Sequence, residues 1–165
     1  MTQKFIPLLL CVLCILWFRM KQPEDRSYFF DAGLRFSCTQ CGKCCTGEPG
    51  IVRATPREIA RIETLTGRSR DDFSDRVSNG YRLKERPGGD CIFFDKGCSI
   101  YEARPLQCRT YPFWFENVRS EKAWAETCEA CPGIGQGRLY PKEEILGLLA
   151  TARTRPANRR TSGPA

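Results

Sequence analysis

Histidine is absent from this chain of 165 residues. Without histidine the chain cannot form a Cys–His or Ser–His catalytic pair, and it lacks the commonest general base near neutral pH. It also lacks the nitrogen ligand that metal sites use most often. A metal ion bound by this chain would therefore be held mainly by sulfur, and 11 cysteines are present to hold it.

A hydrophobic run long enough to cross a membrane is also lacking. The longest apolar stretch covers residues 5–18, whereas a spanning helix needs about 20 residues. No small-x-small cleavage site follows it, as a secretory signal peptide would require. Two interpretations of residues 1–27 stay open: an apolar leader that contacts a membrane only through that stretch, or a wrongly assigned start with translation beginning at Met20. Cys11 and Cys14 lie inside the stretch, and we place them outside any binding site.

Acidic residues are too few to balance the basic ones. The chain has 26 Lys and Arg against 19 Asp and Glu, a formal charge of +7. Two sites of four thiolates each, holding Zn²⁺ or a 4Fe–4S cluster, would lower this charge to about +3. Much of the remaining excess lies in residues 151–165, where we expect a disordered basic tail. We therefore expect no nucleic-acid partner.

Cysteine is the residue type in clear excess. Nine of the 11 cysteines lie outside the apolar N-terminal stretch, and an odd number would leave one thiol unpaired in a disulfide framework. Reduced thiols that bind metal are typical of the cytosol, whereas secreted scaffolds pair their cysteines. The sequence therefore favours a cytoplasmic, reduced metalloprotein over a secreted disulfide-linked protein.

Four of these cysteines lie within eight residues. Cys38, Cys41 and Cys44 follow a C-x2-C-x2-C spacing, and Cys45 forms a vicinal pair with Cys44. Thiolates at this spacing converge on one metal ion or iron–sulfur cluster when the chain turns tightly. Adjacent cysteines rarely reach the geometry of a disulfide. The run from 38 to 45 therefore predicts a metal-binding segment.

Five more cysteines are spread over the second half of the chain. Cys91 and Cys98 bracket a predicted β-turn, so their sulfurs are expected to meet at the base of a hairpin. Cys108 follows a helical turn, and Cys131 precedes a proline, a pair that recurs at cluster ligands. Cys128 is as compatible with a buried inert thiol as with a ligand. Late cysteines that return to an early run are typical of a small metal-centred domain.

The strongest helix signal begins at Thr55. This residue is predicted to be the N-cap, with Pro56 at the first helical position and Glu58 completing a capping box. Gly67 is expected to end the helix. The apolar residues on its predicted buried face are Ile59, Ala60, Ile62 and Leu65.

Short strands and further helices predict an α+β fold. A second short helix is expected to contain Phe73 and Val77, a last helix covers 141–149, and Trp124 is expected to lie on a strand. We predict one small domain over residues 28–150, with two to four helices around a cysteine-ligated site. The other expected strands lie within residues 28–37, 51–54, 81–85 and 91–94.

Five motifs, spread over about residues 28–150, match one known family. They are FSCTQCGKCCTG at 36–47, VRAT at 52–55, CSIY at 98–101, RPLQCRTYPF at 104–113 and CPGIGQG at 131–137. By these motifs the chain resembles the YkgJ-type cysteine-cluster family, whose members are described as zinc- or iron-chelating. The resemblance implies eight metal ligands, and Cys128 is not among them. The implied ligands are Cys38, Cys41, Cys44, Cys45, Cys91, Cys98, Cys108 and Cys131.

Eight thiolates would fill two four-sulfur sites, or one cluster and one zinc site. We therefore expect an iron–sulfur cluster of the 4Fe–4S type, or zinc or iron ions, with a role in electron transfer or metal handling. Two alternatives stay open. One is a redox or methyl-transfer enzyme related to the flagellin lysine methylases, which share the cysteine motif. The other is an interaction module stabilised by zinc.

Charged and aromatic side chains are expected around the cysteines. Lys43, Arg104 and Arg109 flank candidate ligands, where positive charge lowers thiol pKa values and offsets the charge of a thiolate site. Cys44 and Cys45 are adjacent, and we expect them to point to different metals. The aromatic residues expected to wall the site are Tyr101, Tyr111, Phe113 and Trp114.

Overall fold

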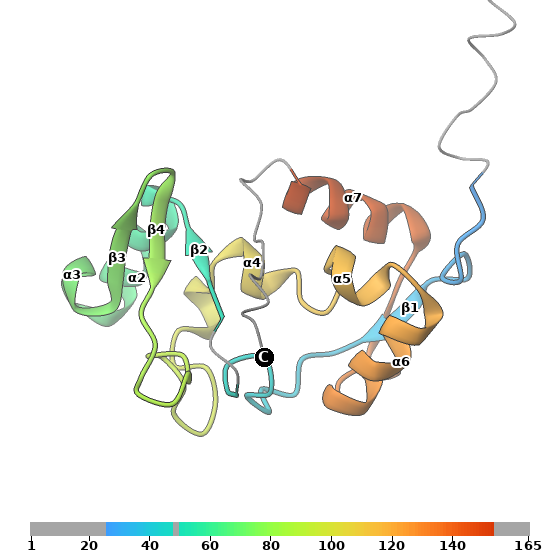
Figure 1. The fold of residues 1–165 in the computed structure, drawn as a ribbon, viewed down its shortest axis with the longest axis horizontal. Helices are drawn as coiled ribbons and strands as arrows, with labels where there is room; N and C mark the ends of the chain where they lie inside the picture. Colours follow the sequence, from blue (N-terminus) through green and yellow to red (C-terminus); the bar gives the residue numbers. More distant parts are fainter. Residues whose placement is uncertain (1–25, 48–49, 154–165) are drawn as a thin grey trace, which may run out of the picture.

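The structure is a computed structural model that describes residues 26–47 and 50–153. Within that range, five short strands form two separate sheets that lie in different halves of the molecule (Figure 1). One sheet is antiparallel in the order β2-β4-β3, and the other is the antiparallel pair β1-β5. The strands are β1 (Leu34–Phe36), β2 (Arg53–Ala54), β3 (Ser74–Val77), β4 (Gly80–Leu83) and β5 (Arg138–Tyr140).

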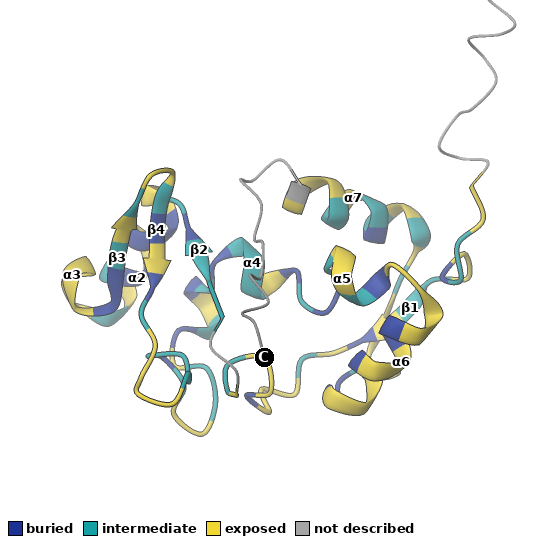
Figure 2. Cartoon of the chain, in the orientation of Figure 1, coloured by how far each residue is buried: buried dark blue, intermediate teal, exposed yellow. Residues whose placement is uncertain are grey.

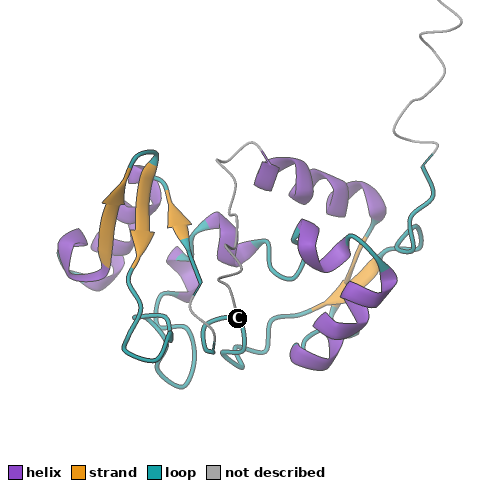
Figure 3. Ribbon diagram, in the orientation of Figure 1, coloured by secondary structure: helices purple, strands orange, loops and turns teal. Residues whose placement is uncertain are grey.

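Six α-helices pack around these strands in the described part of the chain (Figure 3). The predicted α+β class is confirmed. The predicted number of two to four helices falls short of six, because single turns are too short to show helical periodicity. The long helices are α2 (Pro56–Thr66), α6 (Glu121–Ala130) and α7 (Lys142–Arg153). The single turns are α3 (Arg70–Phe73), α4 (Leu106–Arg109), α5 (Phe115–Val118) and the 3₁₀ turn η2 (Tyr101–Ala103).

The start and end of α2 are as predicted. The Thr55 hydroxyl accepts a hydrogen bond from the Glu58 backbone N–H at 3.3 Å, and the Glu58 carboxylate accepts one from the Thr55 N–H at 2.8 Å. Pro56 begins the helix, and Gly67 ends it in the left-handed conformation at φ +66°. The capping box therefore fixes where the chain leaves β2 and enters α2.

The buried face of α2 is only partly as predicted. Ile59 and Ile62 are fully buried, but Leu65 is 50 % exposed and Ala60 is exposed, so the prediction is wrong for these two residues. Glu58 lies on the same face as Leu65, two turns earlier, and is buried because its carboxylate contacts α4. The face is thus covered at its start and open at its end.

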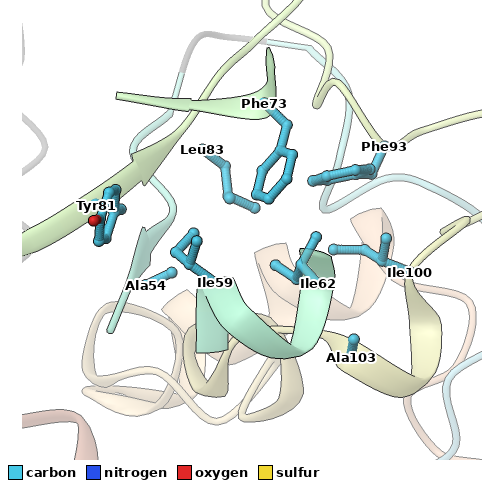
Figure 4. Packing of buried hydrophobic residues seen from close by; sticks show 9 residues of the cluster. All are labelled: Ala54, Ile59, Ile62, Phe73, Tyr81, Leu83, Phe93, Ile100 and Ala103. Carbon is cyan, nitrogen blue, oxygen red and sulfur yellow. The ribbon is translucent and has the colours of Figure 1, made fainter. Parts of the chain in front are cut away.

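The first hydrophobic core lies between α2 and the three-stranded sheet. Figure 4 shows Ile59 and Ile62 pointing from α2 toward Leu83 and Phe73, with the Phe93 ring beside Phe73. The two rings are 5.2 Å apart between centroids. Buried residues concentrate on the inner faces of these elements, whereas the loops below them are more exposed (Figure 2). This core fixes the position of the segments before and after the loop that carries Cys91 and Cys98.

Two local predictions in this region are wrong. Val77 is not helical, because α3 ends after one turn and Ser74 starts strand β3, which connects to β4 through a tight turn at residues 78–79. Residues 91–94 form no strand. Cys91 forms only an isolated β-bridge with Glu85, and the chain turns directly after Cys91.

The second hydrophobic core joins β1 and β5 to α5, α6 and α7. Trp124 lies here on α6 rather than on a predicted strand, and its ring stacks on Phe113 at 6.0 Å with an interplanar angle of 12°. The helix signal was the Ser120 hydroxyl, which accepts a hydrogen bond from the Ala123 N–H and caps α6. Ile145 of α7 is fully buried in the same core.

The structure describes only a small part of the predicted leader and of the predicted tail. Residues 1–25 and 154–165, which include nearly all of the predicted leader and most of the predicted tail, lie outside the described residues. The last helix runs to Arg153, a few residues beyond the predicted end at Leu149. Among the described helices, none combines the length and apolar character needed to cross a membrane.

Candidate metal centre

Eight cysteines line one cavity between the two halves of the molecule. They come from the run at 38–45, the loop at 91–98, helix α4 and the turn after α6. All nine cysteines in the described part of the chain are free thiols. The cavity-lining cysteines are Cys38, Cys41, Cys44, Cys45, Cys91, Cys98, Cys108 and Cys131.

Cys38 and Cys131 both reach the cavity because the backbone just before Cys38 packs closely against the backbone just after Cys131. The Ser37 N–H donates a hydrogen bond to the Gly133 carbonyl at 3.0 Å. A Cβ atom at Gly133 would lie only 2.2 Å from the Ser37 carbonyl oxygen, so only glycine permits this approach. The end of β1 is thereby joined to the turn that carries Cys131, which is itself buried.

The rest of the run is shaped by a turn at Gly42. This glycine is buried with φ +79°, and the Cys45 N–H donates to its carbonyl at 2.7 Å. The Cys45 carbonyl in turn accepts a hydrogen bond from the Cys91 N–H at 2.7 Å. This contact connects the early cysteine run to the later loop, whereas Cys41 and Cys44 are exposed at the outer side.

The loop from 91 to 98 is a compact turn, as its spacing predicted. Phe94 bridges Cys98, and the Asp95 N–H donates to the Gly97 carbonyl at 2.9 Å, with Lys96 at φ +54°. Both cysteines therefore face the same cavity without a regular hairpin.

Helix α4 presents Cys108 and is held by two side chains that sequence reasoning did not assign to the site. The second carboxylate oxygen of Glu58 accepts a hydrogen bond from the Leu106 N–H at 2.7 Å. The Gln107 amide accepts from the Arg53 N–H at 3.0 Å and donates to the Ile51 carbonyl at 2.8 Å. The capping box pointed to Glu58 as a helix residue, but nothing in the local pattern shows that it also binds α4.

Cys128 is separated from the other cysteines. It is exposed on α6 and does not line the cavity. This position agrees with the resemblance, which left Cys128 out of the implied ligands.

The two thiols of the vicinal pair form a hydrogen bond. The two sulfurs of Cys44 and Cys45 are 3.8 Å apart, close enough for one thiol to donate to the other. This hydrogen bond lowers the pKa of Cys44 to about 7 and raises the pKa of Cys45. One of the two thiols is therefore easily ionised, whereas a second ionisation beside it is opposed.

Burial opposes ionisation of the deeper thiols. Loss of hydration raises the pKa values of Cys91, Cys98, Cys108 and Cys131, and the negative charge of neighbouring thiolates raises them further. These side chains are therefore neutral near pH 7 unless a cation enters the cavity. A bound metal ion reverses this preference, because its charge favours the thiolate.

Arg104 supplies a fixed positive charge at the cavity. Its Nη1 lies 3.9 Å from the Cys38 sulfur, and its guanidinium stacks 3.4 Å above the centroid of the Tyr101 ring. Its Nε also donates to the Tyr101 carbonyl at 2.9 Å. The expected place of Arg104 and of Lys43 beside the cysteines is found, whereas Arg109 lines a different hollow.

Two of the four expected wall aromatics line the cavity. Tyr101 and Tyr111 do so, and burial together with nearby cysteines raises the pKa of Tyr111. Phe113 is buried in the second core instead. The Trp114 indole N–H donates to the Gln107 carbonyl at 2.9 Å and so helps to hold α4 in place.

A comparison with known protein families decides the family. The family described as "Putative zinc- or iron-chelating domain", named CxxCxxCC, matches residues 37–132. The chain belongs to the CxxCxxCC family. The matched segment contains all eight cavity-lining cysteines, and its description supports metal binding.

One curated relative of this CxxCxxCC protein is an uncharacterized protein of Methanocaldococcus jannaschii. The two are 36% identical over 58% of this chain and 56% of the relative. The match therefore spans little more than half of the relative's length. No solved structure matches the chain significantly.

The donor chemistry of the CxxCxxCC cavity fits zinc or iron. Thiolates are the preferred ligands of zinc and of iron–sulfur clusters, and the cavity walls are otherwise mostly apolar. Within residues 26–47 and 50–153, no three Cys, Asp or Glu side chains are gathered as a metal site.

Proposed function

We propose that this protein holds an iron–sulfur cluster, zinc, or both through eight cysteine thiolates, and serves in electron transfer or metal handling in a reducing cytoplasm. The observation that carries this proposal is the cavity: eight cysteines from separate segments line it, and Cys128 does not. The C-x2-C-x2-C spacing from Cys38 to Cys44 favours a cluster over zinc.

The experiment is metal analysis of protein purified without oxygen. We expect stoichiometric iron and sulfide with visible charge-transfer absorption for a cluster, or stoichiometric zinc without colour for a zinc site. A folded protein that contains neither metal, and takes up neither on reconstitution, would contradict the proposal.

In this proposal the adjacent thiols Cys44 and Cys45 bind different metals. Negative charge on Cys91 and Cys108 raises the pKa of Cys45. Negative charge on Cys44 raises the pKa values of cysteines in three other segments, namely Cys98, Cys108 and Cys131. Two metal groups that share the eight thiols would therefore both lie close to the vicinal pair.

The vicinal pair provides the test of this division. We expect Cys45→Ser to lose one of the two metals and Cys44→Ser to lose the other, measured as metal content per chain after anaerobic purification. If both variants lose the same metal and keep the other, the division is wrong.

Metal binding should also release protons. Because the deep thiols are neutral near pH 7, a Zn²⁺ ion that takes four thiolates should release close to four protons. About half a proton fewer is expected where Cys44 is a ligand, since its pKa is about 7. Affinity should therefore fall as pH is lowered. Calorimetry of the metal-free protein in buffers of different ionisation enthalpy measures this number, and a value below two would exclude four-thiolate binding.

A further inference from the structure

A second hollow lies between α2 and α4, on a different surface from the cysteine cavity. Its volume is about 410 Å³, within the usual range for small-molecule sites. It shares no lining residue with the cysteine cavity. The residues that line it are Thr55, Arg57, Glu58, Arg61, Leu106 and Arg109.

Three arginines dominate the charge of this hollow. Arg57 and Arg61 are one turn apart on α2, and Arg109 faces them from the end of α4. All three are exposed. The ion pairs formed among the described residues all lie elsewhere. Like charges at this helical spacing repel each other, so an anion bound between the arginines would relieve that repulsion.

The acidic residue in the hollow is already engaged. The Glu58 carboxylate accepts hydrogen bonds from the Thr55 N–H, the Thr55 hydroxyl and the Leu106 N–H. These contacts hold α4 against the start of α2. The start of α2 is capped in the same way, so the guanidinium groups, not the helix end, would recognise a ligand.

Toward the rest of residues 26–47 and 50–153, the three arginines use few of their donors. Arg61 uses one Nη2 contact, to the Glu102 carbonyl at 3.2 Å. A guanidinium presents five N–H donors in a planar fork that matches phosphate oxygens in pairs. Three such groups around one hollow suit a phosphate dianion better than a single carboxylate.

We propose that this hollow binds the phosphate group of a small phosphorylated molecule through Arg57, Arg61 and Arg109. The site is independent of the metal centre in its chemistry. Arg109 directly follows Cys108 on α4, so adjacent residues of one helix line the phosphate site and the cysteine cavity.

Calorimetric titration at fixed ionic strength tests this site, with inorganic phosphate and a sugar phosphate as separate ligands. We expect saturable binding in the millimolar range or tighter. Tighter binding of the sugar phosphate would identify an ester as the ligand, and equal binding would identify free phosphate. Arg109→Gln should weaken binding about tenfold, because one charge-assisted contact is lost. Arg76→Gln, an exposed charge change on β3, should have no effect.

Three results would overturn the proposal. They are the absence of saturable phosphate binding, equal weakening by Arg76→Gln and Arg109→Gln, and binding of a polyglutamate peptide without binding of phosphate. The last result would mean that the hollow docks an acidic protein. Because Arg57, Arg61 and Arg109 do not line the cysteine cavity, metal content measured in the same samples separates this outcome from failure of the metal proposal.

Discussion

Replacing Cys108 with serine is expected to lower the metal affinity of this protein at least about a hundredfold while the metal-free protein keeps its fold. Cys108 lines the cavity from α4, which is held by hydrogen bonds of the Leu106 backbone and of the Gln107 side chain, both independent of the sulfur. The serine hydroxyl can therefore occupy the same place. It remains protonated near neutral pH, and its hard oxygen is a poor ligand for zinc or for a cluster iron.

The matched control is Cys128→Ser. This variant makes the same chemical change on an exposed surface of α6, away from the cavity. We expect it to keep the full metal content. Metal per chain after anaerobic purification, and competition with a chelator, measure both variants. Equal metal content in the two variants would mean that Cys108 is not a ligand.

The parts of this fold that could be predicted from sequence are those fixed by neighbouring residues. The capping box at Thr55 and the left-handed stop at Gly67 need only a few adjacent side chains, and both are found. The turn between Cys91 and Cys98 is similarly local. The cysteines were recognised because clustered thiols have few structural uses, not because their convergence was visible in the sequence.

The parts that could not be predicted depend on how segments far apart in the sequence pack against one another. Leu65 and Glu58 share one face of α2, and only the position of α4 makes the carboxylate buried and the leucine exposed. The Ser120 cap marks the start of the helix that carries Trp124, but the stacking of Trp124 on Phe113 depends on how the segments pack. Gln107 looks like an ordinary polar residue, yet it joins α4 to the segment before α2.

Replacing Gly42 with alanine is expected to lower the free energy of unfolding of the metal-free protein by about 2–5 kcal/mol and to reduce metal loading. Its φ of +79° disfavours any residue with a Cβ atom, at a cost of about 1–2 kcal/mol. The new Cβ would also lie 2.1 Å from Cε2 and 2.5 Å from Cζ of the Phe94 ring. Relieving that overlap costs a further 1–3 kcal/mol, roughly, and displaces the ring or the run.

Gly47→Ala separates the two contributions. Gly47 has φ +98°, but a Cβ atom there would meet nothing within 4 Å, so only the backbone cost of about 1–2 kcal/mol is expected. The double variant Gly42→Ala/Phe94→Ala removes the overlap and should recover metal loading relative to Gly42→Ala. Denaturant unfolding with reductant and chelator, together with metal content of the purified proteins, measures all three. If Gly42→Ala and Gly47→Ala are equally mild, the Phe94 ring moves freely and does not hold the cysteine run in place.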